Sequence, residues 1–165
     1  MNAHVFSCCI TAAVLASAIA RGGSATRSVV IEKELPQPPE KVWRVLTDGP
    51  LIKQWLMDND FQPVVGHRFN FRDKPRPGWD GLVQSEVMIV EPGKTLSYSW
   101  NASAEDAAKG QGSAVTWTLV ATKSGTLVHM ELSGLSTGQE ANYQGAKYAF
   151  QQFFAGMERV AAGLE

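Results

Sequence analysis

The chain has 165 residues, of which 44% are hydrophobic and 19% are charged. This composition suffices for the core of one ordinary domain and excludes a disordered chain. Fifteen Lys and Arg residues nearly balance sixteen Asp and Glu residues, for a formal net charge of −1. We therefore expect no nucleic-acid partner, because nucleic-acid-binding proteins carry a basic excess or stripe.

The first 20 residues contain no charged side chain, and residues 5–20 are almost continuously apolar or small. This run is short for a membrane span, which needs about 20 residues, so we expect no stable membrane span. It ends in Ala18-Ile19-Ala20, a pattern typical of a signal-peptide cleavage site. We predict that residues 1–25 are a signal peptide or N-terminal extension, followed by a domain over residues 27–165. The expected localisation is secreted or periplasmic. The alternative is a cytoplasmic protein with an over-extended start codon.

Both cysteines, Cys8 and Cys9, fall within this N-terminal segment. The predicted domain therefore has no disulfide, no thiol nucleophile and no cysteine-ligated zinc. It also lacks phosphate-binding loops and dinucleotide-binding glycine patterns, so we expect no cofactor and no metal.

The remaining chain predicts an α+β order. A strand over residues 28–35 stops at Pro36, and Pro39 is well placed as the first residue of a helix. A second short helix is expected over residues 51–56. Runs rich in β-branched and aromatic residues, separated by turn residues, then predict an antiparallel meander. The expected strands are residues 66–72, 82–91, 96–101, 114–122 and 126–133.

The last segment changes to a helical period. Apolar residues recur every three or four positions, which predicts an amphipathic helix over residues 138–164. They are Tyr143, Ala146, Phe150, Phe153, Met157, Val160 and Leu164. Thr137 and Glu140 have the spacing of a capping box at its start. Such a helix needs a sheet to pack against.

Several motifs in this order resemble a known family. They include Pro39-Glu40-Lys41-Val42-Trp43, Leu51-Ile52-Lys53-Gln54-Trp55, Gly66-His67-Arg68-Phe69, Leu96-Ser97-Tyr98-Ser99-Trp100 and Val115-Thr116-Trp117-Thr118-Leu119. Residues 27–165 resemble the START-like (SRPBCC) superfamily and, within it, the activator of heat-shock-protein-90 ATPase homologue-like family. The chain departs from the family pattern at His67, where a second Gly is common, and near Phe150, where a Trp is common.

The resemblance implies a helix-grip (START-like, Bet v 1-like) fold, in which a curved antiparallel sheet wraps around the long C-terminal helix. It also implies a hydrophobic cavity between sheet and helix, and binding of a hydrophobic small molecule there without catalysis. On this basis, the expected ligand-binding residues are Trp55, Phe69, Phe71, Tyr98, Trp100, Trp117, Met130, Phe150 and Phe154.

Two alternatives stay open. The first is a cyclase- or dehydratase-type enzyme, for which Glu86, Tyr98, Tyr143 and Tyr148 are the only plausible acids or bases. The second is an adaptor that stimulates a chaperone ATPase through its surface, with a protein partner that the sequence does not identify.

Three further patterns favour ordinary structural interpretations. Ser136 lies in a G-x-S-x-G motif, but no His or Asp follows it, so we expect no nucleophile elbow. Strand alternation predicts that His129 faces solvent and not a metal. Arg68, Arg72, Lys74 and Arg76 gather near one loop, which favours a solvated loop over a docking site for an acidic ligand or protein partner.

Overall fold

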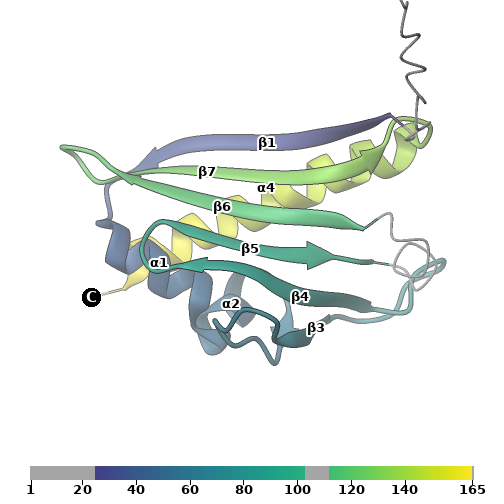
Figure 1. The fold of residues 1–165 in the computed structure, drawn as a ribbon, viewed down its shortest axis with the longest axis horizontal. Coiled ribbons are helices and arrows are strands. Elements are labelled where there is room, and N and C mark those ends of the chain that lie inside the picture. Colours follow the sequence, from purple (N-terminus) through teal and green to yellow (C-terminus); the bar gives the residue numbers. More distant parts are fainter. Residues whose placement is uncertain (1–24, 103–111, 165) are drawn as a thin grey trace, which may run out of the picture.

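Residues 25–102 and 112–164 are described by the computed structural model. Within them, seven antiparallel strands form one sheet in the order β1-β7-β6-β5-β4-β3-β2 (Figure 1). The strands are β1 (Thr26–Leu35), β2 (Asp58–Asn59), β3 (Arg68–Arg72), β4 (Leu82–Glu91), β5 (Thr95–Trp100), β6 (Ser113–Ala121) and β7 (Thr126–Ser136). From β2 to β7 each strand pairs with the next, which confirms the predicted meander. The predicted signal segment, with Cys8 and Cys9, lies outside the described residues.

Two short helices follow β1. Helix α1 (Pro39–Thr47) begins at Pro39, as predicted, because a proline fits the first turn of a helix, where no backbone N–H partner is needed. Helix α2 (Gly49–Trp55) begins two residues earlier than predicted. The reason is local: the side chain of Asp48 accepts a hydrogen bond from the Leu51 N–H at 3.3 Å and caps the helix.

The long C-terminal helix α4 (Glu140–Gly163) is shorter than predicted at its start. The predicted capping box is wrong. Thr137 does not cap the helix; its hydroxyl donates to the Ala25 carbonyl at 3.0 Å, and the side chain of the N-terminal capping residue, Gln139, makes no capping hydrogen bond. The chain before α4 is therefore tied to the beginning of β1 and not to the helix itself.

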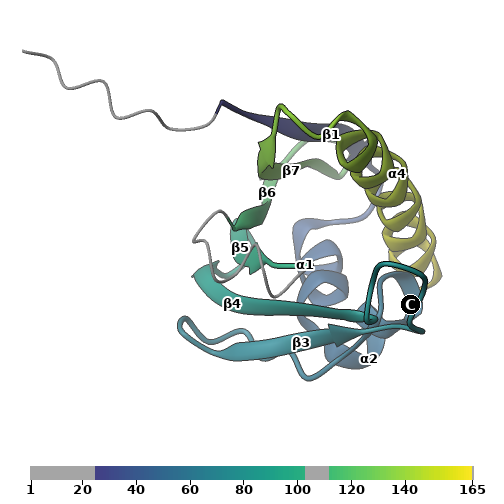
Figure 2. The same cartoon turned by 90° about the vertical axis from the view of Figure 1, so that its right-hand side faces the viewer.

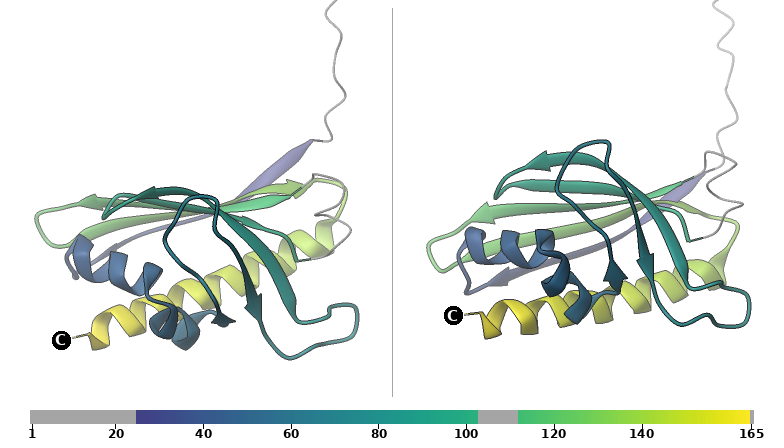
Figure 3. Two further views of the ribbon diagram at one scale, coloured as in Figure 1. Left: turned by 60° about the horizontal axis from the view of Figure 1, so that its bottom comes forward. Right: turned by 90° about the horizontal axis from the view of Figure 1, so that it is seen from below.

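Helix α4 lies along the concave side of the curved sheet (Figure 2). Helices α1 and α2 lie beside its C-terminal half, whereas its N-terminal half extends toward the opposite end of the sheet (Figure 3). This arrangement confirms the expected helix-grip fold. It also means that the two halves of α4 have different surroundings, because α1 and α2 cover only one of them.

The concave face of the sheet carries the core. Alternate residues of each strand point inward, which is the period-2 pattern of a half-buried strand. On β6 these are Val115, Trp117 and Leu119, each at most 5% exposed. From α4, Met157 and Ala161 are fully buried against them and the two short helices. The core is thus densest around the C-terminal half of α4.

Candidate ligand groove

A groove of about 890 Å³ that is open to solvent lies at the N-terminal half of α4. Its walls come from the start of β1, the ends of β5 and β7, the start of β6 and the hairpin between β3 and β4. The lining residues in the described part of the chain are Thr26, Trp79, Trp100, Ala102, Gly112, Ser113, Leu132, Gly134, Leu135, Ser136, Gln139, Ala141, Asn142, Tyr143, Gly145 and Ala146. The groove therefore exists where α1 and α2 do not reach.

Small residues on α4 leave this space open. Ala141, Gly145 and Ala146 line the groove, and a Cβ atom added to Gly145 would meet no other atom within 4 Å. In the C-terminal half, by contrast, a Cβ atom on Gly156 would lie 3.1 Å from the Trp55 Cβ. Similar small residues thus make a close helix–helix contact at one end of α4 and a vacant volume at the other.

The apolar part of the groove is largely aromatic. Trp79 enters from the hairpin between β3 and β4, Trp100 from the end of β5, and Tyr143 from α4. Hydrogen bonds hold two of these rings: the Trp79 indole donates to the Leu82 carbonyl at 3.0 Å, and the Tyr143 hydroxyl donates to the Ser28 carbonyl at 3.5 Å. Flat rings held in this way suit a flat or broad apolar ligand.

The polar part consists of amides and hydroxyls. Gln139 and Asn142 lie at the start of α4, and Ser113 and Ser136 lie on β6 and β7. Among the described residues that line the groove, none carries a formal charge at neutral pH, and Tyr143 is the only titratable one. The described walls therefore offer hydrogen bonds to a ligand but no ion pair.

Arg27 supports Tyr143 from outside the groove. The guanidinium carbon lies 3.6 Å from the centre of the Tyr143 ring, and Arg27 is not part of the groove lining. The same guanidinium pairs with Glu140 at 2.6 Å. A hydrogen bond from Gln144 and the contact with Arg27 lower the pKa of Glu140, so this carboxylate is ionised at neutral pH. Arg27 thus links β1 to the first turn of α4 while covering one face of the aromatic ring.

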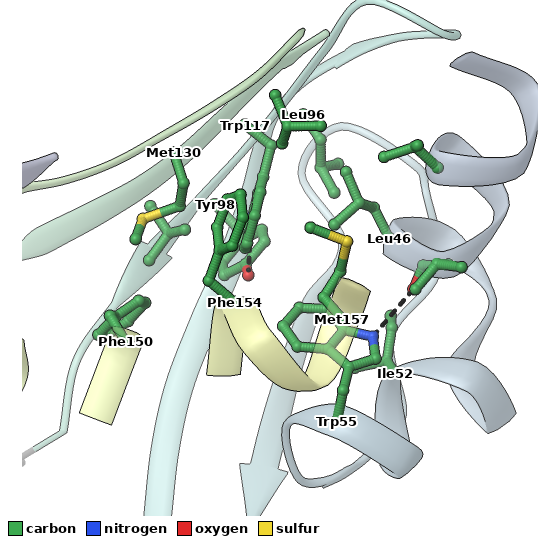
Figure 4. Close-up of a cluster of buried hydrophobic side chains, with 14 of the residues drawn as sticks. Leu46, Ile52, Trp55, Leu96, Tyr98, Trp117, Met130, Phe150, Phe154 and Met157 are labelled. Atoms are coloured by element: carbon green, nitrogen blue, oxygen red, sulfur yellow. Dashed lines mark hydrogen bonds between the residues drawn. The ribbon is translucent and has the colours of Figure 1, made fainter. Parts of the chain in front are cut away.

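The nine residues predicted to bind ligand gather on the concave side of the sheet and the facing side of α4, but only Trp100 lines the groove. The other eight are buried, each at most 7% exposed. They are Trp55, Phe69, Phe71, Tyr98, Trp117, Met130, Phe150 and Phe154. Several of them converge from α2, α4, β5, β6 and β7 in Figure 4. Their ligand-binding role stays a prediction.

Contacts among these rings show a packed interior. Trp55 meets Trp117 edge to face at 5.7 Å between ring centres, and Trp117 stacks on Phe154 at 5.9 Å. Phe150 meets Trp100 edge to face at 5.1 Å, which places this pair at the border between the packed core and the groove. The void lies beyond Phe150, toward the beginning of α4.

The candidate acid–base residues are dispersed. Glu86 pairs with Arg68 at 2.9 Å on the outer side of the sheet, and Tyr148 is 68% exposed. Tyr98 is buried, and its hydroxyl accepts a hydrogen bond from the Trp117 indole at 3.3 Å. Burial raises the pKa of the Tyr98 phenol well above its usual range, so it does not ionise at neutral pH. Of the four candidates only Tyr143 borders the groove.

Ser136 borders the groove but has no triad around it. Its hydroxyl accepts from the Gly138 N–H at 3.3 Å, as in a turn. The two described histidines are engaged elsewhere: His129 contacts Glu32 at 3.0 Å on the outer face of the sheet, and His67 contacts the Asp60 carbonyl at 3.0 Å. In residues 25–102 and 112–164, no three His, Cys, Asp or Glu side chains cluster as metal ligands would.

The basic loop is largely neutralised by local carboxylates. Arg68 pairs with Glu86, Arg72 with Asp60 at 3.0 Å, and Arg76 with Asp73 at 2.7 Å. The backbone N–H of Asn70 and the Arg72 guanidinium lower the pKa of Asp60. These pairs favour the interpretation as a solvated loop.

A family model described as "Activator of Hsp90 ATPase homolog 1-like protein" matches residues 36–162. This match covers most of the chain. The chain belongs to this family. Members of the family and the wider START-like superfamily share the helix-grip fold seen here, so the resemblance noted in the sequence is confirmed. No match to the chain was found among curated protein sequences.

Solved structures agree with the family assignment. A protein from Mesorhizobium loti is 46% identical, with a TM-score of 0.75 over 84% of this chain and 99% of that one. The Aha1 dimer from Colwellia psychrerythraea is 18% identical, with a TM-score of 0.68 over 80% of this chain and 93% of that one. DynU16, from the dynemicin biosynthetic locus, is 20% identical, with a TM-score of 0.66 over 82% of this chain and 47% of that one. The last two show the fold alone.

The sequence interpretation missed most of the groove. Trp79 lies in a turn-rich segment, where the sequence gives no signal that a ring will face a ligand volume. Tyr143 was predicted on the inner face of the helix, but its contact with Arg27 joins residues 116 positions apart, which no local pattern reveals. Gln139 and Asn142 could have been suspected only from the small residues that follow them on α4.

Within the described residues, no helix is both long and apolar enough to span a membrane.

Proposed function

We propose that the protein binds a largely apolar, uncharged small molecule in the groove at the N-terminal half of α4, without catalysing its conversion. The observation that carries this proposal is a volume of about 890 Å³ with three aromatic rings and several hydrogen-bonding side chains on its walls. A concave, mainly apolar site with a few polar groups is the usual form of a small-molecule site.

The absence of catalysis is part of the proposal. A general acid or base must lie within hydrogen-bond reach of the reacting atom. Among the described lining residues only Tyr143 is titratable, and its hydroxyl is directed to the Ser28 carbonyl. Within the part of the chain that the structure describes, a cyclase or dehydratase would have only this one phenol on the groove walls, which makes the enzyme alternative the weaker one.

The proposal is tested by filling the groove. Ala146 lines the groove on the inner side of α4, so Ala146→Leu places a larger side chain in the ligand volume. Ala155→Leu is the matched control, because Ala155 is exposed on the same helix and does not line the groove. Leu and Ala both favour helices, so the two changes should have similar effects on the helix itself.

Dodecan-1-ol, progesterone and 2-naphthol serve as uncharged probes of different shape. We expect at least one of them to raise the melting temperature through mass action. Binding should also change the tryptophan fluorescence of the protein, to which Trp79 and Trp100 contribute. Ala146→Leu should weaken this binding at least about tenfold, and Ala155→Leu should leave it unchanged. If no probe binds the wild-type protein, or if folded Ala146→Leu protein binds as well as the control, the proposed function is wrong.

A second candidate is association with a protein. Four exposed apolar residues favour it: Val64 and Val65, each at least 58% exposed, and Met88 and Ile89, each at least 42% exposed. The Gly66 N–H donates to the Val87 carbonyl at 2.8 Å, which brings the segment before β3 next to β4. The Aha1 neighbour from Colwellia psychrerythraea was solved as a dimer. We propose self-association at this surface as the alternative function.

Light scattering on a sizing column tests this candidate. Val65→Asp should convert a dimer into a monomer, whereas Val120→Asp should not, because Val120 is also more than half exposed but lies on β6. A wild-type protein that stays monomeric at high concentration would rule out self-association. That result would leave the groove proposal intact.

A further inference from the structure

The two rings at the rim of the groove, Trp79 and Tyr143, each have an arginine close by that does not line the groove. Arg27 lies 3.6 Å from the centre of the Tyr143 ring, and Arg76 lies 5.7 Å from the centre of the Trp79 ring. Neither arginine is among the lining residues, although both rings are. Each guanidinium group therefore approaches its ring without being part of the groove lining.

The position of Arg27 is firmly held. Its guanidinium pairs with Glu140 at 2.6 Å, and its side chain is only 27% exposed. Arg76 pairs with Asp73 at 2.7 Å but is 67% exposed, and it is farther from its ring. Solvent therefore screens the charge of Arg76 more than that of Arg27. Both arginines should disfavour a cationic ligand, and Arg27 should have the larger effect.

A cation on one face of an aromatic ring changes what the other face will accept. The face of a ring normally attracts cations because its π electrons carry partial negative charge. On Tyr143, the Arg27 guanidinium already lies over one face of the ring and interacts with these π electrons. A second cation on the free face would lie about 7 Å from the first, where like charges repel unless solvent screens them. An uncharged, electron-rich ring on that face meets no such repulsion.

We infer that Arg27 and Arg76 make the groove selective by charge, so that it accepts uncharged, electron-rich aromatic ligands and discriminates against organic cations with the same ring system. This inference rests on the proposed function, because it concerns the ligand of the same groove. It assigns to Arg27 a role in specificity although Arg27 does not touch the ligand.

Glu140 carries the opposite charge to Arg27, so a change at Glu140 should affect the selectivity in the opposite direction. Its carboxylate offsets part of the Arg27 charge, and it does not line the groove. Removing the arginine should relax the discrimination against cations, whereas removing the carboxylate should sharpen it. A purely structural role for the Arg27–Glu140 pair would give the same result for both changes.

The test compares two probes with one ring system, 2-naphthol and (2-naphthyl)trimethylammonium, by nuclear magnetic resonance titration of the full chain. The readout is the ratio of the two dissociation constants. We expect the wild-type protein to bind 2-naphthol at least about tenfold more tightly. Arg27→Gln should lower this ratio about three- to tenfold, Arg76→Gln should lower it less, and Glu140→Gln should raise it.

Two controls separate charge from structure. Arg27→Lys keeps a cation over the ring and should retain most of the discrimination. Lys33→Gln removes another ion pair between β1 and α4, Lys33–Glu158 at 2.6 Å, whose residues do not line the groove, and should leave the ratio unchanged. Melting temperatures of all variants show that they are folded.

Three results would overturn the inference. One is a wild-type protein that binds the cation as tightly as 2-naphthol. Another is a ratio that Arg27→Gln leaves unchanged, or that Arg27→Gln and Glu140→Gln move in the same direction. The third is binding of progesterone or dodecan-1-ol without any binding of 2-naphthol, which would leave the proposed function standing. If none of these probes binds, the proposed function and this inference both fail.

Discussion

Gly156 of α4 packs directly against Trp55 at the end of α2. A Cβ atom on Gly156 would lie 3.1 Å from the Trp55 Cβ and 3.2 Å from the Trp55 carbonyl oxygen. Trp55 is also fixed by a hydrogen bond from its indole to the Val45 carbonyl at 3.1 Å (Figure 4). The two helices can therefore approach this closely only because residue 156 has no side chain.

Gly156→Ala should destabilise the protein although alanine favours helices. The added methyl group would come within 3.2 Å of the Trp55 Cβ and the Trp55 carbonyl oxygen, and such overpacking costs about 1–3 kcal/mol. Gly163→Ala is the control, because a Cβ atom there meets nothing within 4 Å and should stabilise the helix by up to about 1 kcal/mol. Urea unfolding measures both. Equal effects of the two changes would mean that the contact at Trp55 relaxes freely.

Phe150→Ala should remove a central part of the core between α4 and the sheet. Phe150 is 4% exposed and contacts Trp100 and Phe153 edge to face. Truncating a buried Phe costs about 3–5 kcal/mol, although the neighbouring groove can let the site relax toward the lower value. Gln151→Ala, at an exposed position of the same helix, should change the free energy of unfolding by less than about 0.5 kcal/mol. If Phe150→Ala lowered the free energy of unfolding no more than Gln151→Ala does, Phe150 would not be part of the core.

Tyr98→Phe should leave the Trp117 indole N–H without its acceptor. This hydrogen bond, at 3.3 Å, lies in the packed core, and an unsatisfied buried donor costs about 1–3 kcal/mol. Tyr148→Phe, at a side chain that is 68% exposed, should be neutral. Denaturant unfolding at pH 7 separates the two variants. A neutral Tyr98→Phe would show that the indole finds another acceptor.

Tyr98 should also make the protein sensitive to alkali. Burial raises the pKa of the Tyr98 phenol in the native state, while an unfolded Tyr has a pKa of about 10. The stability that this difference provides is complete below pH about 10 and falls as the pH rises above that value. The gap in stability between wild type and Tyr98→Phe should therefore narrow above pH 10. A constant gap up to pH 11.5 would contradict this assignment.

Asp60 should contribute to acid sensitivity in the opposite direction. The Asn70 N–H and Arg72 lower the pKa of Asp60 in the native state below the unfolded value of about 4. Its contribution is present above that pH and is lost as the pH falls through the lower, native pKa. Because the carboxylate is about half exposed, Asp60→Asn should cost less than about 1 kcal/mol at pH 7, and this cost should shrink as the pH is lowered toward 2. Asp80→Asn is a nearby exposed control, with urea unfolding at both pH values.

Much of the fold could be predicted from local patterns. Alternation on the strands and the helical period of residues 143–164 depend only on neighbouring residues, and both are confirmed. Pro39 marked a helix start for the same reason, since its ring restricts its own backbone. The two-residue strand β2 was missed, because Asp58 and Asn59 have no strand character of their own and pair only where β3 is placed beside them.

The candidate site was predicted less well, and the reason lies in the helix. Ala146 and Gly156 both belong to the small, inward-facing part of α4, so the sequence alone treats them alike. In the structure, Trp55 packs against Gly156, whereas Ala146 borders the groove. The reason is that α1 and α2 lie beside the C-terminal half of α4 and do not reach its N-terminal half. The void therefore lies toward the N-terminal half, beyond most of the rings that were expected to form its walls.

The sequence by itself determined the α+β class, the meander that leads to β7, the inward face of the last helix and the aromatic character of the interior. Each of these follows from propensity and periodicity, which act between residues close in the chain. Only the tertiary structure decided which of those aromatic rings pack against one another and which border a groove. That division depends on where two short helices end and on contacts such as Arg27 with Tyr143, between residues more than a hundred positions apart.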